Sequence, residues 1–147
     1  MATTYNASGM SINAITAQRA GDVIAVHSTF ALSAALIVND VVKFATLPAG
    51  CVPVDCVVDC DDLDTGVAPA VVVEVGFTGG DTDALIAAST VGQAGGVERA
   101  NVATAFRVVP TATDRTVQLK VATAPATSAV AGTVGLTLTY RAAQVDE

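Results

Sequence analysis

The sequence predicts an all-β protein: a single antiparallel β-sandwich of about eight strands, for which a jelly-roll order is one candidate, with an extended N-terminal arm and one short helix in a loop. Val, Ala and Thr supply most of a composition that is 52% hydrophobic, and small and β-branched side chains suit pleated sheets. Short segments of alternating apolar and polar residues are separated by turn residues at the spacing typical of sandwich strands. The length of 147 residues fits one domain.

The first twenty residues are the predicted arm, and residues 21–147 are the predicted sandwich domain. The arm is small and polar, and its apolar side chains follow no sustained period; they are Tyr5, Met10, Ile12 and Ile15. Two interpretations remain open, a disordered terminus or a segment that becomes ordered against a partner through these four residues.

Eight segments are predicted to be strands: 22–28, 30–38, 41–47, 52–60, 69–77, 103–109, 115–123 and 132–141. The alanines and leucines of 30–38 would also fit a helical turn. The apolar run 84–88 is predicted to be the short helix, with Asp81 or Asp83 as its cap and Gly92 beyond its end.

The last two strands alternate most clearly. Their apolar residues are predicted to face inward: Val117, Leu119, Val121, Val134, Leu136, Leu138 and Tyr140. Because sequential antiparallel strands are usually neighbours, we expect these two strands to pair as a hairpin.

The charge, the hydropathy and the first residues each argue against a class of protein. The formal net charge is −7, so attraction to nucleic acid is not expected. No stretch of about 18 apolar residues is present, which argues against a membrane span. The first residues lack the basic and apolar regions of a signal peptide, so we expect synthesis in the cytoplasm.

Eight of the fourteen acidic residues lie between Asp55 and Asp83, and this local acidity suggests calcium as a ligand. The candidate ligands on two loops are Asp61, Asp62, Asp64, Asp81 and Asp83. Their spacing fits neither an EF-hand nor a repeated calcium motif. The other interpretation is that these aspartates end strands and cap turns by accepting hydrogen bonds from nearby backbone amides.

Three cysteines, Cys51, Cys56 and Cys60, have the spacing C-x4-C-x3-C, which is not that of a structural zinc site. Cys56 and Cys60 fall in register with Val54 and Val58, so we expect an apolar row facing the core. An odd number of cysteines in a chain without an export signal argues against a disulfide framework.

Catalytic patterns are absent from the sequence. The single histidine, His27, lies in an alternating strand, where a packed or edge position is expected. No serine lies in a G-x-S-x-G turn, and the glycines of GQAGG (92–96) are not followed by the residues of a phosphate loop. The sequence therefore predicts neither an enzyme nor a cofactor.

Several blocks together resemble the structural proteins of tailed-bacteriophage virions, of the head decoration or cement type: NDVVKFATLPAG (39–50), VPVDCVVDCDDLDTG (52–66), STVGQAGG (89–96) and GTVGLTLTYR (132–141). The resemblance covers most of residues 22–141. It implies a protein of the virion surface that binds the major capsid protein, forms a homodimer or homotrimer and stabilises the head. Two alternatives remain, a tail, baseplate or fibre component and a calcium-dependent surface-binding β module.

Overall fold

The computed structural model of the chain describes residues 1–8, 10 and 22–143. These residues form nine strands: β1 (Thr4–Asn6), β2 (Val23–Ala31), β3 (Val41–Leu47), β4 (Cys51–Cys60), β5 (Val72–Phe77), β6 (Ile86–Ser89), β7 (Gly96–Arg99), β8 (Arg115–Thr123) and β9 (Thr133–Ala142). Two short 3-10 helices join them, η1 (Val91–Gln93) and η2 (Ala103–Arg107). None of the helices in this part of the chain could cross a membrane.

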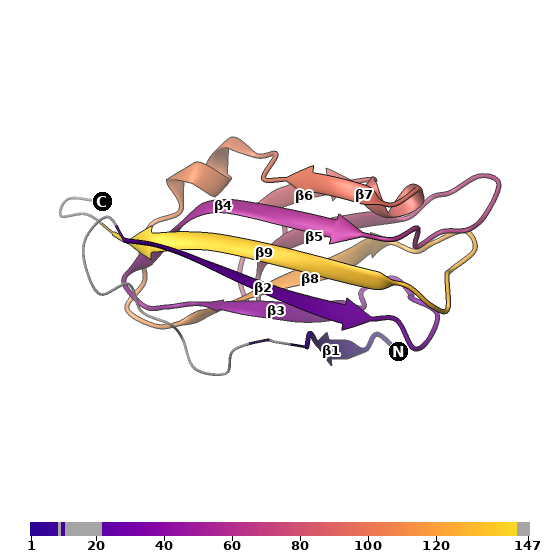
Figure 1. Cartoon of the computed structure of the whole chain (residues 1–147), viewed down its shortest axis with the longest axis horizontal. Helices are drawn as coiled ribbons and strands as arrows, with labels where there is room; N and C mark the ends of the chain where they lie inside the picture. Colours follow the sequence, from indigo (N-terminus) through magenta and orange to yellow (C-terminus); the bar gives the residue numbers. More distant parts are fainter. Residues whose placement is uncertain (9, 11–21, 144–147) are drawn as a thin grey trace.

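The strands form two stacked sheets, which confirms the predicted β-sandwich (Figure 1). One sheet has the order β2-β9-β4-β7, and the other has the order β1-β3-β8-β5-β6. Without β1, these orders are those of a jelly roll, in which two Greek keys fold over each other. Strand β1 is additional to the jelly roll. It lies at one edge and pairs with β3 in parallel, whereas the other strand pairs are antiparallel.

The core lies between the two inner faces, because alternate side chains of each strand point to the same side. All the predicted inward residues of β8 and β9 are buried. The largest fully buried side chains include Tyr140, Phe44, Leu47, Leu63 and Leu136. Alternation therefore identified the inner faces correctly.

The predicted hairpin between 115–123 and 132–141 is wrong. Strand β8 lies between β3 and β5, whereas β9 lies between β2 and β4 in the other sheet. The two strands are consecutive in sequence, but the segment between them crosses from one sheet to the other. Each becomes a central strand of its own sheet, so their inward faces meet across the core instead of side by side.

Three local predictions also need correction. The predicted strand 30–38 is not formed. Its first two residues, Phe30 and Ala31, are the end of β2, and an irregular loop follows. The run 84–88 is not a helix, since β6 begins at Ile86 and pairs with β5. A short apolar run does not distinguish these two states by pattern. Residues 103–107 form η2 rather than a strand.

Candidate functional site

The acidic loop after β4 is held together by one buried carboxylate. Asp64 is 1% exposed. Its Oδ2 accepts hydrogen bonds from the backbone amides of Ala70 (2.7 Å), Val71 (3.1 Å) and Ala126 (2.8 Å), and its Oδ1 accepts one from Thr127 (2.8 Å). Burial raises the pKa of Asp64, but these four bonds outweigh it and hold the pKa well below its usual range. The carboxylate thus joins two loops.

The other calcium candidates do not gather around the Asp64 carboxylate. Asp61 accepts a hydrogen bond from the amide of Thr133, and Asp62 accepts one from the amide of Asp64. Asp81 lies beyond the other end of β5, where its carbonyl accepts a hydrogen bond from the amide of Phe77. Strand β5, six residues long, therefore separates Asp81 and Asp83 from the aspartates of the loop after β4 by about 17 Å.

Within residues 1–8, 10 and 22–143, no three His, Cys, Asp or Glu side chains are arranged to hold a metal ion. Asp81 and Asp83 do interact with each other. A hydrogen bond from the Asp81 side chain, burial and the charges of Asp81 and Glu74 together raise the pKa of Asp83. This effect is local to the loop between β5 and β6 and does not involve the loop that contains Asp64.

The cysteines are free thiols on β4. Cys56 and Val58 are buried and Cys60 is half-buried, but Val54 is 37% exposed. A β-bulge between Pro53 and Asp55 changes which side chains point inward, so the predicted apolar row begins after the bulge.

The environments of Cys56 and Cys60 disfavour their thiolate forms. Burial, and then the charge of Asp55, raises the pKa of Cys56 to about 12. Burial raises the pKa of Cys60 to about 11, with the charges of Asp59, Asp61 and Asp62 adding to the effect. Metal binding and nucleophilic attack both require the thiolate, which is scarce at neutral pH in such sites.

His27 lies exposed on β2, an edge strand. Its Nδ1 is 2.9 Å from the hydroxyl of Thr137 on the adjacent strand. Among the described residues, this ring makes no hydrogen bond to a carboxylate or a thiol, so His27 has no partner there of the kind that a catalytic pair needs.

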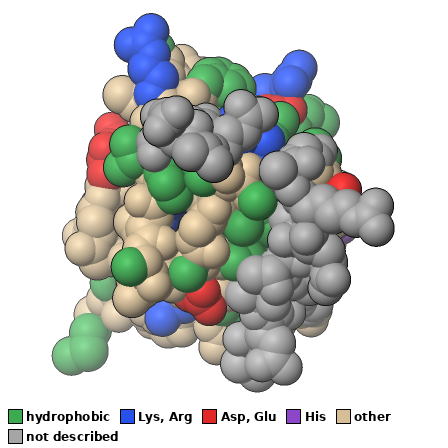
Figure 2. All heavy atoms as spheres, turned by 90° about the vertical axis from the view of Figure 1, so that its left-hand side faces the viewer, with side chains coloured by type: hydrophobic (Ala, Val, Ile, Leu, Met, Phe, Trp, Pro, Cys, Tyr) green, Lys and Arg blue, Asp and Glu red, His purple; other side chains and the backbone are tan. Residues whose placement is uncertain are grey.

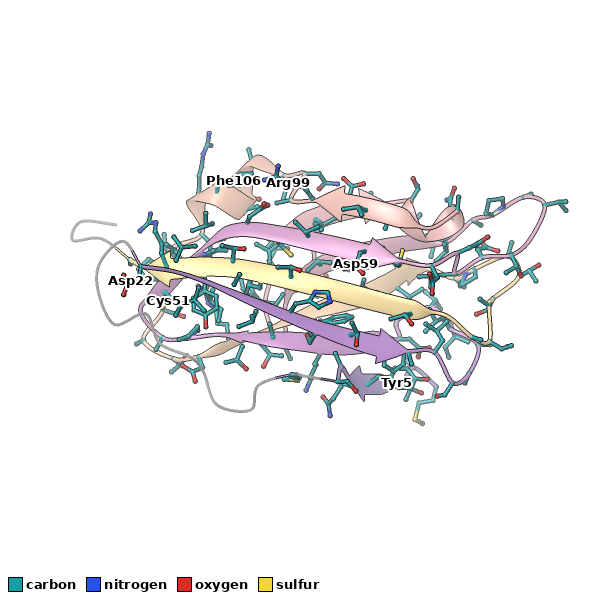
Figure 3. All side chains as sticks on the ribbon, in the orientation of Figure 1. Tyr5, Asp22, Cys51, Asp59, Arg99 and Phe106 are labelled. Carbon is teal, nitrogen blue, oxygen red and sulfur yellow. The ribbon has the colours of Figure 1, made fainter. Side chains whose placement is uncertain are left out.

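The first part of the predicted arm belongs to the sandwich. The carbonyl of Thr3 accepts a hydrogen bond from Val41, and the amide of Thr3 donates to Asp40 at 2.7 Å. Tyr5 is half-buried, with its ring centroid 4.9 Å from that of Phe30 (Figure 3 labels Tyr5). Met10 is also half-buried. The other two partner-binding candidates, Ile12 and Ile15, lie outside the described residues.

The sequence did not predict the surface around η2. Val102, Ala105 and Val108 turn toward the sandwich, the spacing of three expected when side chains of a 3-10 helix eclipse one another. Phe106, between them, is 59% exposed (Figure 3). The sequence signal for this surface was the period of three in VATAFRV (102–108). The adjacent Val108 and Val109, followed by Pro110, made the segment look like the end of a strand instead.

Two hollows lie on either side of the segment after η2. The larger, of about 540 Å³, lies against the loop between β5 and β6, and the smaller, of about 180 Å³, lies against the start of β4. We call residues 77–84, 104–109 and 111–115 the η2 end. Figure 2, which looks at the molecule from the left-hand side of Figure 1, shows basic and hydrophobic side chains together on this side.

The chain is similar over its whole length to a chain in the structure of the capsid of Ralstonia phage GP4. The identity is 36% and the TM-score 0.85, and the match covers 97% of this chain and 99% of that one. A chain in the capsid asymmetric unit of cyanophage Pam1 is 25% identical with a TM-score of 0.69, and the match covers 88% of this chain and 91% of that one.

A chain in the acidic stable capsid of Helicobacter pylori bacteriophage KHP30 shares the fold alone, with 16% identity, a TM-score of 0.51 and coverage of 81% of this chain and 92% of that one. No protein-family model and no curated protein matches the sequence.

Proposed function

This chain belongs to the family of structural proteins of tailed-bacteriophage capsids, and from that premise we propose that it is a decoration, or cement, protein. In this role it is not an enzyme. It binds the outside of the lattice formed by the major capsid protein, as a homodimer or homotrimer, and stabilises the head. The observation that carries the proposal is the end-to-end match with a capsid chain: a single sandwich of 147 residues corresponds to that whole chain.

The charge favours the outer surface over the inner one. Packed DNA lines the inside of a filled head, and a protein with a formal net charge of −7 would be repelled by its phosphates. On the outside that repulsion is screened by the shell and by salt. An acidic surface there also keeps particles apart in solution.

The fold suits a protein that reinforces a shell. Its buried residues form one core that spans both sheets. Each copy on a lattice needs only moderate affinity, because copies that bridge neighbouring subunits act together. The stabilisation therefore arises from many repeated contacts rather than from one strong site.

The experiment uses particles from which this protein has been removed, to which the purified full chain is added back. Electron microscopy is expected to show added density on the outer face of the head, and the restored heads are expected to release DNA at a higher temperature than the bare ones. Density on the inner face or on the tail would overturn the proposal, and so would identical release temperatures. An unrelated acidic protein of similar mass, added in the same way, serves as the control for nonspecific binding.

A further inference from the structure

The larger hollow of the η2 end has the properties of a binding site. Its volume of about 540 Å³ lies within the range of about 300–1,000 Å³ that is usual for ligand sites. Phe77, Ala84, Val108 and Val109 give it apolar walls, and threonine hydroxyls line the remainder. Concave apolar surface with a few polar groups is the usual composition of a recognition site.

Arg115 enters this hollow with hydrogen-bonding capacity left over. Its guanidinium carbon lies 4.5 Å from the ring centroid of Phe77, and Nη2 donates to the carbonyl of Val109 at 3.2 Å. Among the described residues, no acceptor is available to its buried Nε. Burial lowers the pKa of this guanidinium, and leaving a buried donor unpaired is costly. A stacked, fixed guanidinium is well placed to receive an anionic group.

The net charge of the hollow is positive in an otherwise acidic protein. Arg107 and Arg115 both line it, and Asp81 is the single acidic residue that does so. Arg107 is exposed at the end of η2 and makes no ion pair or hydrogen bond with the described residues. By contrast, Arg99 and Lys120 are already paired with carboxylates.

Exposed apolar side chains lie beside the hollow. Val109, which is 67% exposed, lines both hollows together with Arg107, and Phe106, the residue before Arg107, is 59% exposed and lines the smaller hollow. An exposed aromatic ring beside arginine is the composition found at the centres of protein–protein interfaces. A small inorganic anion would leave these side chains in water, whereas a peptide would cover them.

We propose that the η2 end binds an acidic side chain, Asp or Glu, carried on an apolar segment of the major capsid protein. Arg115 and Arg107 hold the carboxylate, and Phe106 and Val109 pack against the flanking residues. A singly charged carboxylate fits better than a phosphate, because Asp81 at the same hollow repels a second negative charge more strongly. This inference rests on the proposed function, since it names the surface through which the shell is bound.

The test measures binding of the full chain to heads from which it has been removed. Arg107→Glu reverses the charge at a side chain without a described partner, so the fold is retained. Phe106→Ser removes the exposed aromatic ring, and Lys43→Gln, which removes one positive charge on β3 outside the lining of both hollows, is the control. We expect Arg107→Glu and Phe106→Ser each to weaken binding by about tenfold or more, and Lys43→Gln to bind like the wild type.

The outcomes separate the two proposals. If the wild-type chain does not bind heads, the proposed function fails. If the wild type binds and the two η2-end variants bind equally well, only the present inference is overturned. Thermal unfolding of each variant checks that the sandwich is intact, and Arg107→Gln replaces Arg107→Glu if it is not. A reconstruction of decorated heads is expected to show a capsid carboxylate in the hollow; a second copy of this chain there would also overturn the inference.

Discussion

Cys56 is expected to make the folded protein less stable as the pH rises above 9. Its thiol pKa is raised from 9.0 to about 12 by burial and by Asp55. The folded state therefore holds the proton more tightly than the unfolded state. The sign follows from linkage: the associated stability is fully present below pH 9, and it is lost as the pH rises toward 12.

The magnitude at pH 10 comes from the two ionisation equilibria. With a pKa of 9.0 the unfolded thiol is about nine-tenths ionised, and with a pKa near 12 the folded thiol is about one-hundredth ionised. The difference destabilises the folded protein by roughly 1 kcal/mol relative to pH 8. Since Cys56 is 1% exposed, solvent screening reduces this value little.

The assay is urea unfolding at pH 8 and pH 10 for the wild type, Cys56→Ala and Val58→Ala. Val58 is equally buried on the same strand and carries no proton, so its truncation controls for the loss of packing. The free energy of unfolding of Cys56→Ala is expected to fall by roughly 1 kcal/mol less between the two pH values than that of the other two proteins. Equal losses in all three would refute the account of a buried, neutral thiol.

Three further predictions concern the loops and the other thiol. Cys60, with a pKa of about 11, is expected to react with a thiol reagent at pH 8 at least about 100-fold more slowly in the folded protein than in urea, and equal rates would contradict the raised pKa. Asp64→Asn is expected to lower the midpoint of thermal unfolding far more than Asp22→Asn, an exposed control. That difference should shrink as the pH falls below about 4, because the stability from the lowered pKa of Asp64 is fully present above the unfolded value and is lost progressively as the pH falls below it. Gly76→Ala would place Cβ against the backbone carbonyl oxygen of Asp81, closer than van der Waals contact allows, and is expected to prevent folding. Gly80→Ala, with its nearest atom at 3.9 Å, should be tolerated, and similar yields and melting curves for the two variants would argue against this packing.

Alternation predicted most of the strands because it reports directly on which side chains are buried. Strand β8 has the predicted bounds, β4 begins one residue earlier than predicted, and β9 begins and ends one residue later. The pattern is clear there because all three strands lie inside their sheets, with one face on the core and the other toward water. The bulge near Pro53 shows the limit, since one inserted residue reverses the faces before it without changing composition.

Strand pairing and the η2 end could not be predicted in the same way. Alternation states that a face is buried but not which sheet buries it, so β8 and β9 looked like a hairpin. The pairing of β1 depends on Thr3, whose partners Asp40 and Val41 are distant in sequence. Phe106 is exposed only because η2 replaces the predicted strand there, and no period of two marks that change.

The two ends of the sandwich use their charged groups in opposite ways. At the end with the N-terminus, Asp40 and Asp64 are each 1% exposed, and backbone amides occupy their oxygens (Figure 1). Those carboxylates fix loops in place and have little capacity for another ligand. At the η2 end, Arg107 and Arg115 keep donors that the described residues do not use. This polarity favours attachment at the η2 end and exposure of the acidic loop to solvent.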